Sequence, residues 1–230
     1  MPDIASIVHI ASVWVIPVLV AITFHEAAHG FVAWKLGDDT AFRLGRVTFN
    51  PLKHVDLFGT VLLPALLIVT RAPFLFGWAK PVPVDFRRLD SPRRDMVWVA
   101  AAGPGINIAL ALGSAALIHI ALMLPPTASR WLIEVLQNSI IINVMLAVFN
   151  MLPLPPLDGG RVAVGLLPDA LAYPLARLER YGLFILVALI FVVPYLGDMV
   201  GMQIDIFAWL VAVPANFVIE VVMTAVGLSN

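Results

Sequence analysis

The chain has 230 residues, of which 61% are hydrophobic and only 13% charged. Soluble domains are about half apolar and about a quarter charged, so this composition indicates an integral membrane protein. The net charge of −1 comes without a long run of Lys or Arg, which argues against a nucleic-acid partner. Cysteine is absent, so disulfides, thiolate metal sites and cysteine nucleophiles are excluded, and any metal must be held by His, Asp or Glu.

Several segments are long and apolar enough to cross a bilayer as helices, which takes about 20 residues. They cover roughly residues 7–36, 95–123, 130–152, 180–197 and 204–228, with 180–197 the shortest. A further apolar stretch, 58–70, is too short by this criterion and carries Pro64 in its middle. This stretch is either a sixth crossing or a re-entrant hairpin.

The positions of the basic residues distinguish these two topologies, because cytoplasmic loops are enriched in Lys and Arg. Six crossings with a cytoplasmic N-terminus place nine of the 14 basic residues inside. Five crossings, with 58–70 re-entrant and the N-terminus outside, place 13 of the 14 inside, with Arg130 the exception. We therefore predict an all-α polytopic membrane protein with about five crossings. It forms a single membrane-embedded domain, 1–230, in which the helices of 178–230 are accessory.

An extended stretch follows the hairpin. In KPVPVDF, residues 80–86, the side chains of Val82, Val84 and Phe86 fall on one face of an extended chain. The two prolines of this stretch lack N–H groups, which suits an edge strand. We therefore predict a small β-sheet at the cytoplasmic interface.

The first apolar segment contains HEAAH, the H-E-x-x-H pattern. His25 and His29 lie one helical turn apart on one face, so both imidazoles can bind one divalent ion. Glu26 lies about 100° around the helix, where it can act as a general base toward a metal-bound water. Burying such side chains in hydrocarbon is costly, and metal coordination compensates the cost. The alternative is a polar packing cluster satisfied by neighbouring helices.

A catalytic zinc usually has three protein ligands and an open position for water. The stretch FNMLPLPPLDGGR, 149–161, places Asn150 and Asp158 in an apolar setting at the end of a membrane helix. We predict Asp158 as the third ligand. It can meet His25 and His29 only if the crossings 7–36 and 130–152 run in the same direction, which the five-crossing topology requires.

The stretch AAGPGINIAL, 101–110, contains small residues that allow close helix approach. Asn107 supplies the only side-chain amide of that predicted helix. The stretch serves either packing alone or the support of backbone or substrate near the metal site.

Together, HEAAH, GPGIN and NMLPLPPLDGG, in this order and each on a membrane segment, resemble the site-2 protease family of intramembrane zinc metallopeptidases. The resemblance covers about residues 15–165 and is closest to a compact prokaryotic form without PDZ or nucleotide-sensing domains. It implies His25, His29 and Asp158 as ligands of one zinc ion, Glu26 as the catalytic base, and Asn107 and Asn150 as polar helpers near the substrate.

The resemblance also implies the function. We expect an endopeptidase of the prokaryotic inner or plasma membrane that cleaves membrane-protein substrates within or near a transmembrane segment, with its active site toward the cytoplasm. An edge strand at 81–86 would hold the unwound substrate by strand addition. The alternative is a metal-ion transporter or metal-sensing membrane protein with the same ligands, but Glu26 favours the enzyme because a transporter needs no base. The roles of His54, Asp56 and Glu220, and the oligomeric state, stay open.

Overall fold

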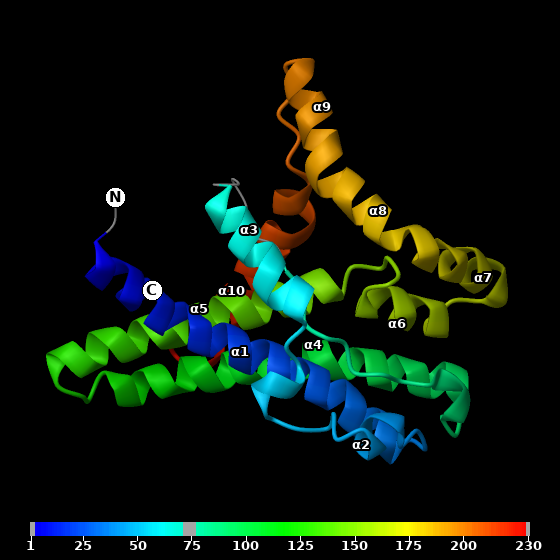
Figure 1. Ribbon diagram of the computed structural model, residues 1–230, viewed down its shortest axis with the longest axis horizontal. Helices are drawn as coiled ribbons and strands as arrows, with labels where there is room; N and C mark the ends of the chain where they lie inside the picture. The colour runs from blue at the N-terminus through cyan, green and yellow to red at the C-terminus, as the bar shows by residue number, and fades with distance from the viewer. Residues whose placement is uncertain (1–2, 71–76, 229–230) are drawn as a thin grey trace.

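The computed structural model describes residues 3–70 and 77–228, and every regular element within them is a helix (Figure 1). The helices are α1 (Ile4–Lys35), α2 (Thr40–Arg43), η1 (Pro51–Lys53), η2 (Leu57–Leu62), α3 (Leu63–Val69), η3 (Phe86–Arg88), α4 (Pro92–Ala121), α5 (Pro126–Asn150), α6 (Asp158–Leu166), α7 (Asp169–Arg177), η4 (Leu178–Tyr181), α8 (Gly182–Val187), η5 (Ala188–Val192), α9 (Val193–Met199), η6 (Ala208–Ala212) and α10 (Val213–Ala225).

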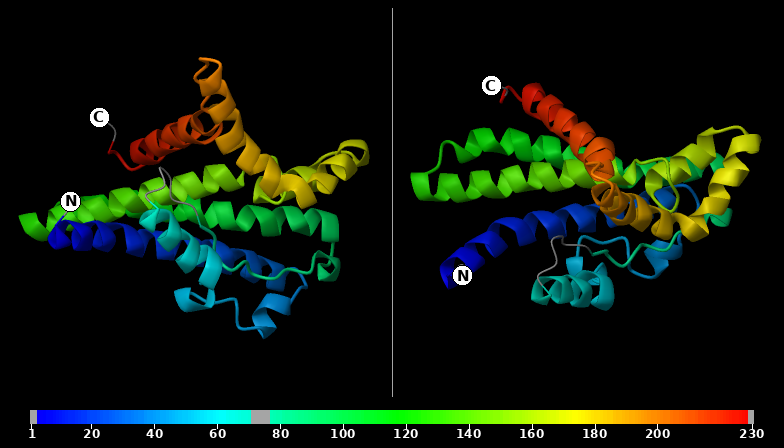
Figure 2. Two further views of the ribbon diagram at one scale, coloured as in Figure 1. Left: turned by 45° about the horizontal axis from the view of Figure 1, so that its top comes forward. Right: turned by 90° about the horizontal axis from the view of Figure 1, so that it is seen from above.

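The three longest helices, α1, α4 and α5, lie side by side and form the body of the molecule (Figures 1 and 2). Near its start α1 contacts the first half of α5, where His9 Nε2 lies 2.7 Å from Glu134 Oε2. Farther along, Asn107 of α4 donates to the carbonyl of Ala21, and Val99 lies beside His29. The helices α1 and α5 therefore run in the same direction, and α4 runs against both.

Small residues explain how closely these helices approach. Ala21, Ala27 and Ala33 of α1 are buried, as is Gly103 of α4, which lies against His25 and His29. Packing between membrane helices relies on such residues, because lipid is as apolar as the side chains and gives no hydrophobic driving force. The small residues thus bring the α1 and α4 backbones together at the level of HEAAH.

Five helical segments among the described residues are long and apolar enough to cross a membrane, as predicted. They are Ile4–Lys35, Pro92–Ala121, Pro126–Asn150, Asp169–Met199 and Ala208–Ala225. The fourth starts earlier than the predicted 180–197 because α7 continues into α8 and α9. This segment departs from the body of the molecule, and α10 returns to pack on α4 and α5 (Figures 1 and 2).

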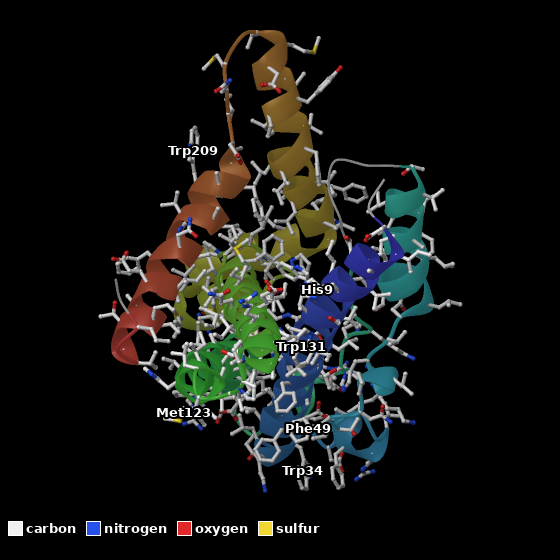
Figure 3. All side chains as sticks on the ribbon, turned by 90° about the vertical axis from the view of Figure 1, so that its left-hand side faces the viewer. His9, Trp34, Phe49, Met123, Trp131 and Trp209 are labelled. Atoms are coloured by element: carbon white, nitrogen blue, oxygen red, sulfur yellow. The ribbon has the colours of Figure 1, made fainter. Side chains whose placement is uncertain are left out.

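Large apolar side chains point outward on all sides of the bundle. Figure 3 looks along the long helices from the end that carries His9 and Trp131, with Phe49 on one side and Trp209 on the opposite side. Phe49 is 67% exposed and Trp209 is 62% exposed. Such a surface suits hydrocarbon as its solvent and supports a multi-pass membrane protein.

The chain between α1 and α4 leaves and returns at one end of the bundle. The N–H of Asp90 donates to the carbonyl of Leu36 over 2.9 Å, so the end of α1 meets the approach to α4. Within this segment, the N–H of Lys80 donates to the carbonyl of His54 over 2.9 Å. The helices η2 and α3 thus belong to an out-and-back excursion, as a hairpin requires; residues 71–76, part of the predicted hairpin, lie outside the described range.

The predicted β-sheet is not confirmed. Residues 78–85, here called the strap, have no regular secondary structure, and the described residues contain no strand. The prolines remove two donors, and three of the remaining N–H groups have acceptors outside any strand: Lys80 donates to the carbonyl of His54, Val82 to Glu26 and Asp85 to Asp38. These bonds take the place of the strand ladder that was predicted here.

Candidate metal centre

Three side chains that are far apart in the sequence converge at one buried point. The Nε2 atoms of His25 and His29 lie 3.0 Å apart. Asp158 Oδ2 lies 3.2 Å from the Nε2 of His25 and 3.3 Å from that of His29. The three ligand atoms all lie within 4.8 Å of one another, so a single metal ion can contact all three.

The parallel course of α1 and α5 produces this meeting. Both histidines lie in the second half of α1, and Asp158 is the first residue of α6, after the turn that follows α5. The turn is tight, because a Cβ on Gly159 would lie 2.2 Å from the carbonyl oxygen of Met151 and one on Gly160 would lie 2.2 Å from the nitrogen of Pro155. The two glycines are therefore needed where the chain folds back to present Asp158.

The hydrogen bonds of Asn107 fix the tautomer of His25. The amide nitrogen of Asn107 donates to the carbonyl of Ala21 over 3.2 Å and to Asn143 Oδ1 over 2.7 Å, so the Oδ1 of Asn107 is an acceptor. That oxygen lies 2.6 Å from His25 Nδ1, which must carry the proton. In the neutral imidazole, Nε2 therefore presents a lone pair to the cluster.

The same logic applies to His29. Its Nδ1 lies 2.7 Å from the carbonyl oxygen of Val99, an acceptor, so the proton is on Nδ1 and the lone pair is on Nε2. Partners of this kind are typical of histidines that bind metals, because they orient the ring and select the tautomer.

The donor atoms of the cluster suit a bound cation. Asp158 Oδ2 is buried without a hydrogen-bond partner. Two lone pairs and a carboxylate oxygen thus face one another, an arrangement that is repulsive when empty. Two imidazoles and one carboxylate fit zinc and leave a fourth position open, as in catalytic zinc sites.

The backbone of α4 forms one wall of the cluster. A Cβ on Gly103 would lie 2.5 Å from His29 Nε2 and 2.6 Å from His25 Cε1. Only glycine leaves enough room for the imidazoles at this position. The GPG sequence of α4 therefore serves the site through its lack of side-chain volume.

Glu26, which follows His25 in α1, lies beside the cluster. Its Oε2 accepts a hydrogen bond of 2.7 Å from the N–H of Val82 in the strap. The carboxylate is half-buried. It therefore borders the cluster without being one of the three converging groups.

The structure places the two predicted amide helpers differently. Asn107 contacts His25 directly, whereas Asn150 donates to the carbonyl of Leu146 in its own helix over 3.0 Å. Asn143, which is fully buried and bonded to Asn107, was not predicted as part of the site. A polar residue inside an apolar helix, one turn after Ser139, was the available signal.

The three residues whose roles stayed open lie outside the cluster. His54 is buried, and its Nε2 lies 3.0 Å from the carbonyl oxygen of Thr48. Asp56 caps η2 by accepting from the N–H of Gly59 over 2.7 Å. Glu220 is exposed on α10. His54 and Asp56 thus shape the excursion that carries the strap.

Comparisons with known proteins agree with this chemistry. The profile of "Peptidase family M50" matches residues 115–193. "Putative zinc metalloprotease YwhC" of Bacillus subtilis is 41% identical over 184 residues, which cover 78% of this chain and 80% of that protein. "Putative zinc metalloprotease Rip2" of Mycobacterium tuberculosis H37Rv is 30% identical over 192 residues, or 84% of this chain and 70% of that protein. No solved structure matches the chain.

Proposed function

This chain belongs to peptidase family M50, the site-2 protease family, and we propose that this zinc metallopeptidase cleaves its substrates within the bilayer. The substrates would be membrane proteins, cut within or near a transmembrane segment, in the prokaryotic cell membrane. The observation that carries this proposal is the position of the His25, His29 and Asp158 cluster, buried among helices long and apolar enough to cross a membrane.

The proposed roles follow from the donor atoms. His25, His29 and Asp158 hold the zinc ion, and Asn107 keeps the His25 ring in the required tautomer. Bound zinc polarises a carbonyl and lowers the pKa of a coordinated water to about 7. The Glu26 carboxylate takes the proton of the attacking water and delivers it to the leaving amine.

The proposed depth of the site is toward the cytoplasm. His25 precedes the end of α1 at Lys35 by 10 residues, or about 15 Å of helix at 1.5 Å per residue. With the N-terminus outside, Lys35 and the basic residues of the following segment lie on the cytoplasmic side. A substrate helix must unwind there, because its carbonyls are otherwise bonded within the helix.

The transporter alternative has lost its support. The relatives are named zinc metalloproteases, and Glu26 occupies the position of a base next to a ligand. A metal-sensing role without hydrolysis would leave this carboxylate only its hydrogen bond with the N–H of Val82.

Purified wild-type protein in proteoliposomes, incubated with single-span substrates, tests the proposal. We expect fragments whose new ends map by mass spectrometry to the transmembrane segment, and none from the Glu26→Gln protein. Cleavage confined to water-soluble peptides, with the single-span substrates intact, would contradict an intramembrane function.

A further inference from the structure

The strap contacts Glu26 through a single backbone donor. Val82 lies between Pro81 and Pro83, which have no N–H groups. The N–H of Val82 is thus the only backbone donor of this tripeptide, and it donates to Glu26 Oε2 over 2.7 Å. One oxygen of the carboxylate is fixed by this bond, which limits how the side chain can turn.

The backbone just before Val82 is held by a buried cation. Arg46 is only 8% exposed, and its Nη2 donates to the carbonyl of Lys80 over 2.8 Å and to that of Pro81 over 3.4 Å. None of the salt bridges found among the described residues involves Arg46, and its Nε is buried without a partner. A buried, incompletely satisfied guanidinium is costly, so its contact with these two carbonyls needs an explanation.

The other contacts of this part of the strap fix its position over α1. The N–H of Lys80 donates to the carbonyl of His54 over 2.9 Å. The side chain of Val82 is buried beside Gly30, where a Cβ would lie 3.0 Å from Val82 Cγ1. Arg46 and His54 thus hold one end of a short chain of contacts, and Glu26 accepts the hydrogen bond at the other end.

We propose that Arg46 is a positioning residue for Glu26, acting through the Lys80 and Pro81 carbonyls and the Val82 N–H. This rests on the proposed function, in which Glu26 is the base. With Oε2 held by Val82, the other carboxylate oxygen is fixed in direction for proton transfer. Orientation of this kind affects the chemical step much more than it affects substrate binding.

The kinetic test compares Arg46→Gln, Arg46→Lys and Val82→Pro with wild type. We expect Arg46→Gln to lower kcat by about 10- to 100-fold with KM nearly unchanged and zinc content retained. Val82→Pro removes the N–H that reaches Glu26 and should have a similar effect, with little further loss in the double variant. Arg46→Lys should recover part of the rate, because its ammonium group can still donate to a carbonyl. Arg43→Gln is the matched control, since Arg43 is exposed and pairs with Asp39.

A second readout does not depend on activity. The chain has no cysteine, so Val84→Cys places a single thiol in the strap. Arg46→Gln should accelerate its reaction with a thiol reagent while the melting temperature stays near that of the Val84→Cys parent. This result tests the attachment of the strap even if no proteolysis is found, so failure of the proposed function and failure of this inference are distinguishable.

The outcomes separate three roles for the strap. Faster labelling with reduced kcat supports the proposal. Faster labelling with unchanged kcat overturns it, because the strap would then be held without orienting Glu26. A higher kcat also overturns it, because the strap would then block the site. If Arg46→Gln does not fold, Arg46→Lys and Val82→Pro decide, and normal kcat in both refutes the proposal.

Discussion

Substitution of Gly103 by alanine tests the metal centre most directly. The added Cβ would lie 2.5 Å from His29 Nε2, whereas ordinary contacts begin near 3.4 Å, so the groups must separate by 0.9 Å. The neighbours cannot give way freely, because His25 is bonded to Asn107 and His29 to the Val99 carbonyl. Overpacking of this kind costs about 1–3 kcal/mol of stability. Displacing metal ligands should also weaken zinc binding, by about 10- to 100-fold if the effect resembles loss of an outer partner.

The assay is a zinc competition titration against a chelator of known affinity, with the melting temperature measured in parallel. Gly105→Ala is the matched control, because it lies two residues away on α4 and its Cβ would meet nothing within 4 Å. We expect Gly105→Ala to bind zinc like wild type. Equal zinc affinity in the two alanine variants would refute the account of α4 as a wall of the site.

Glu26→Gln should keep its zinc and lose cleavage, because the amide cannot accept a proton; residual cleavage near the wild-type rate would remove Glu26 as the base. Asn107→Ala should lower zinc affinity by about 10- to 100-fold, because the proton of His25 Nδ1 loses its acceptor; unchanged affinity in the chelator titration would contradict this. Arg43→Cys and Arg88→Cys should both resist an impermeant thiol reagent in intact cells and react in inverted vesicles. Reaction of only one from outside would place a crossing between them.

The sequence predicted those parts of the site that depend on helical period and topology. Spacing within HEAAH places His25 and His29 on one face, and the charge asymmetry of the loops predicts parallel helices that bring Asp158 to the same end. Both predictions depend on patterns that can be read from the sequence: the helical repeat and the distribution of Lys and Arg. The side-chain convergence in the structure agrees with this reasoning.

Other features depended on contacts that no local pattern encodes. The β-sheet was predicted from alternation in residues 80–86, but the donors and acceptors there bond to Glu26, Asp38 and Arg46. Asn107 was predicted to lie near the substrate, and its bond with His25 became evident only once α1 and α4 were seen together. In each case the two hydrogen-bonding residues lie more than 30 residues apart in the sequence, so local patterns could not predict the bond.

The order in which the three proposed zinc ligands occur along the chain has a consequence for biosynthesis. His25 and His29 enter the membrane with α1, but Asp158 follows α5 and is made 129 residues after His29. At about 5–20 residues per second, a growing chain carries two ligands for about 6–26 s before the third emerges. During this interval the nascent protein has only an incomplete binding site, so zinc is held weakly and hydrolysis cannot start. With Asp158 as the third proposed ligand, we expect no proteolytic activity until α5 and the turn after it are in place.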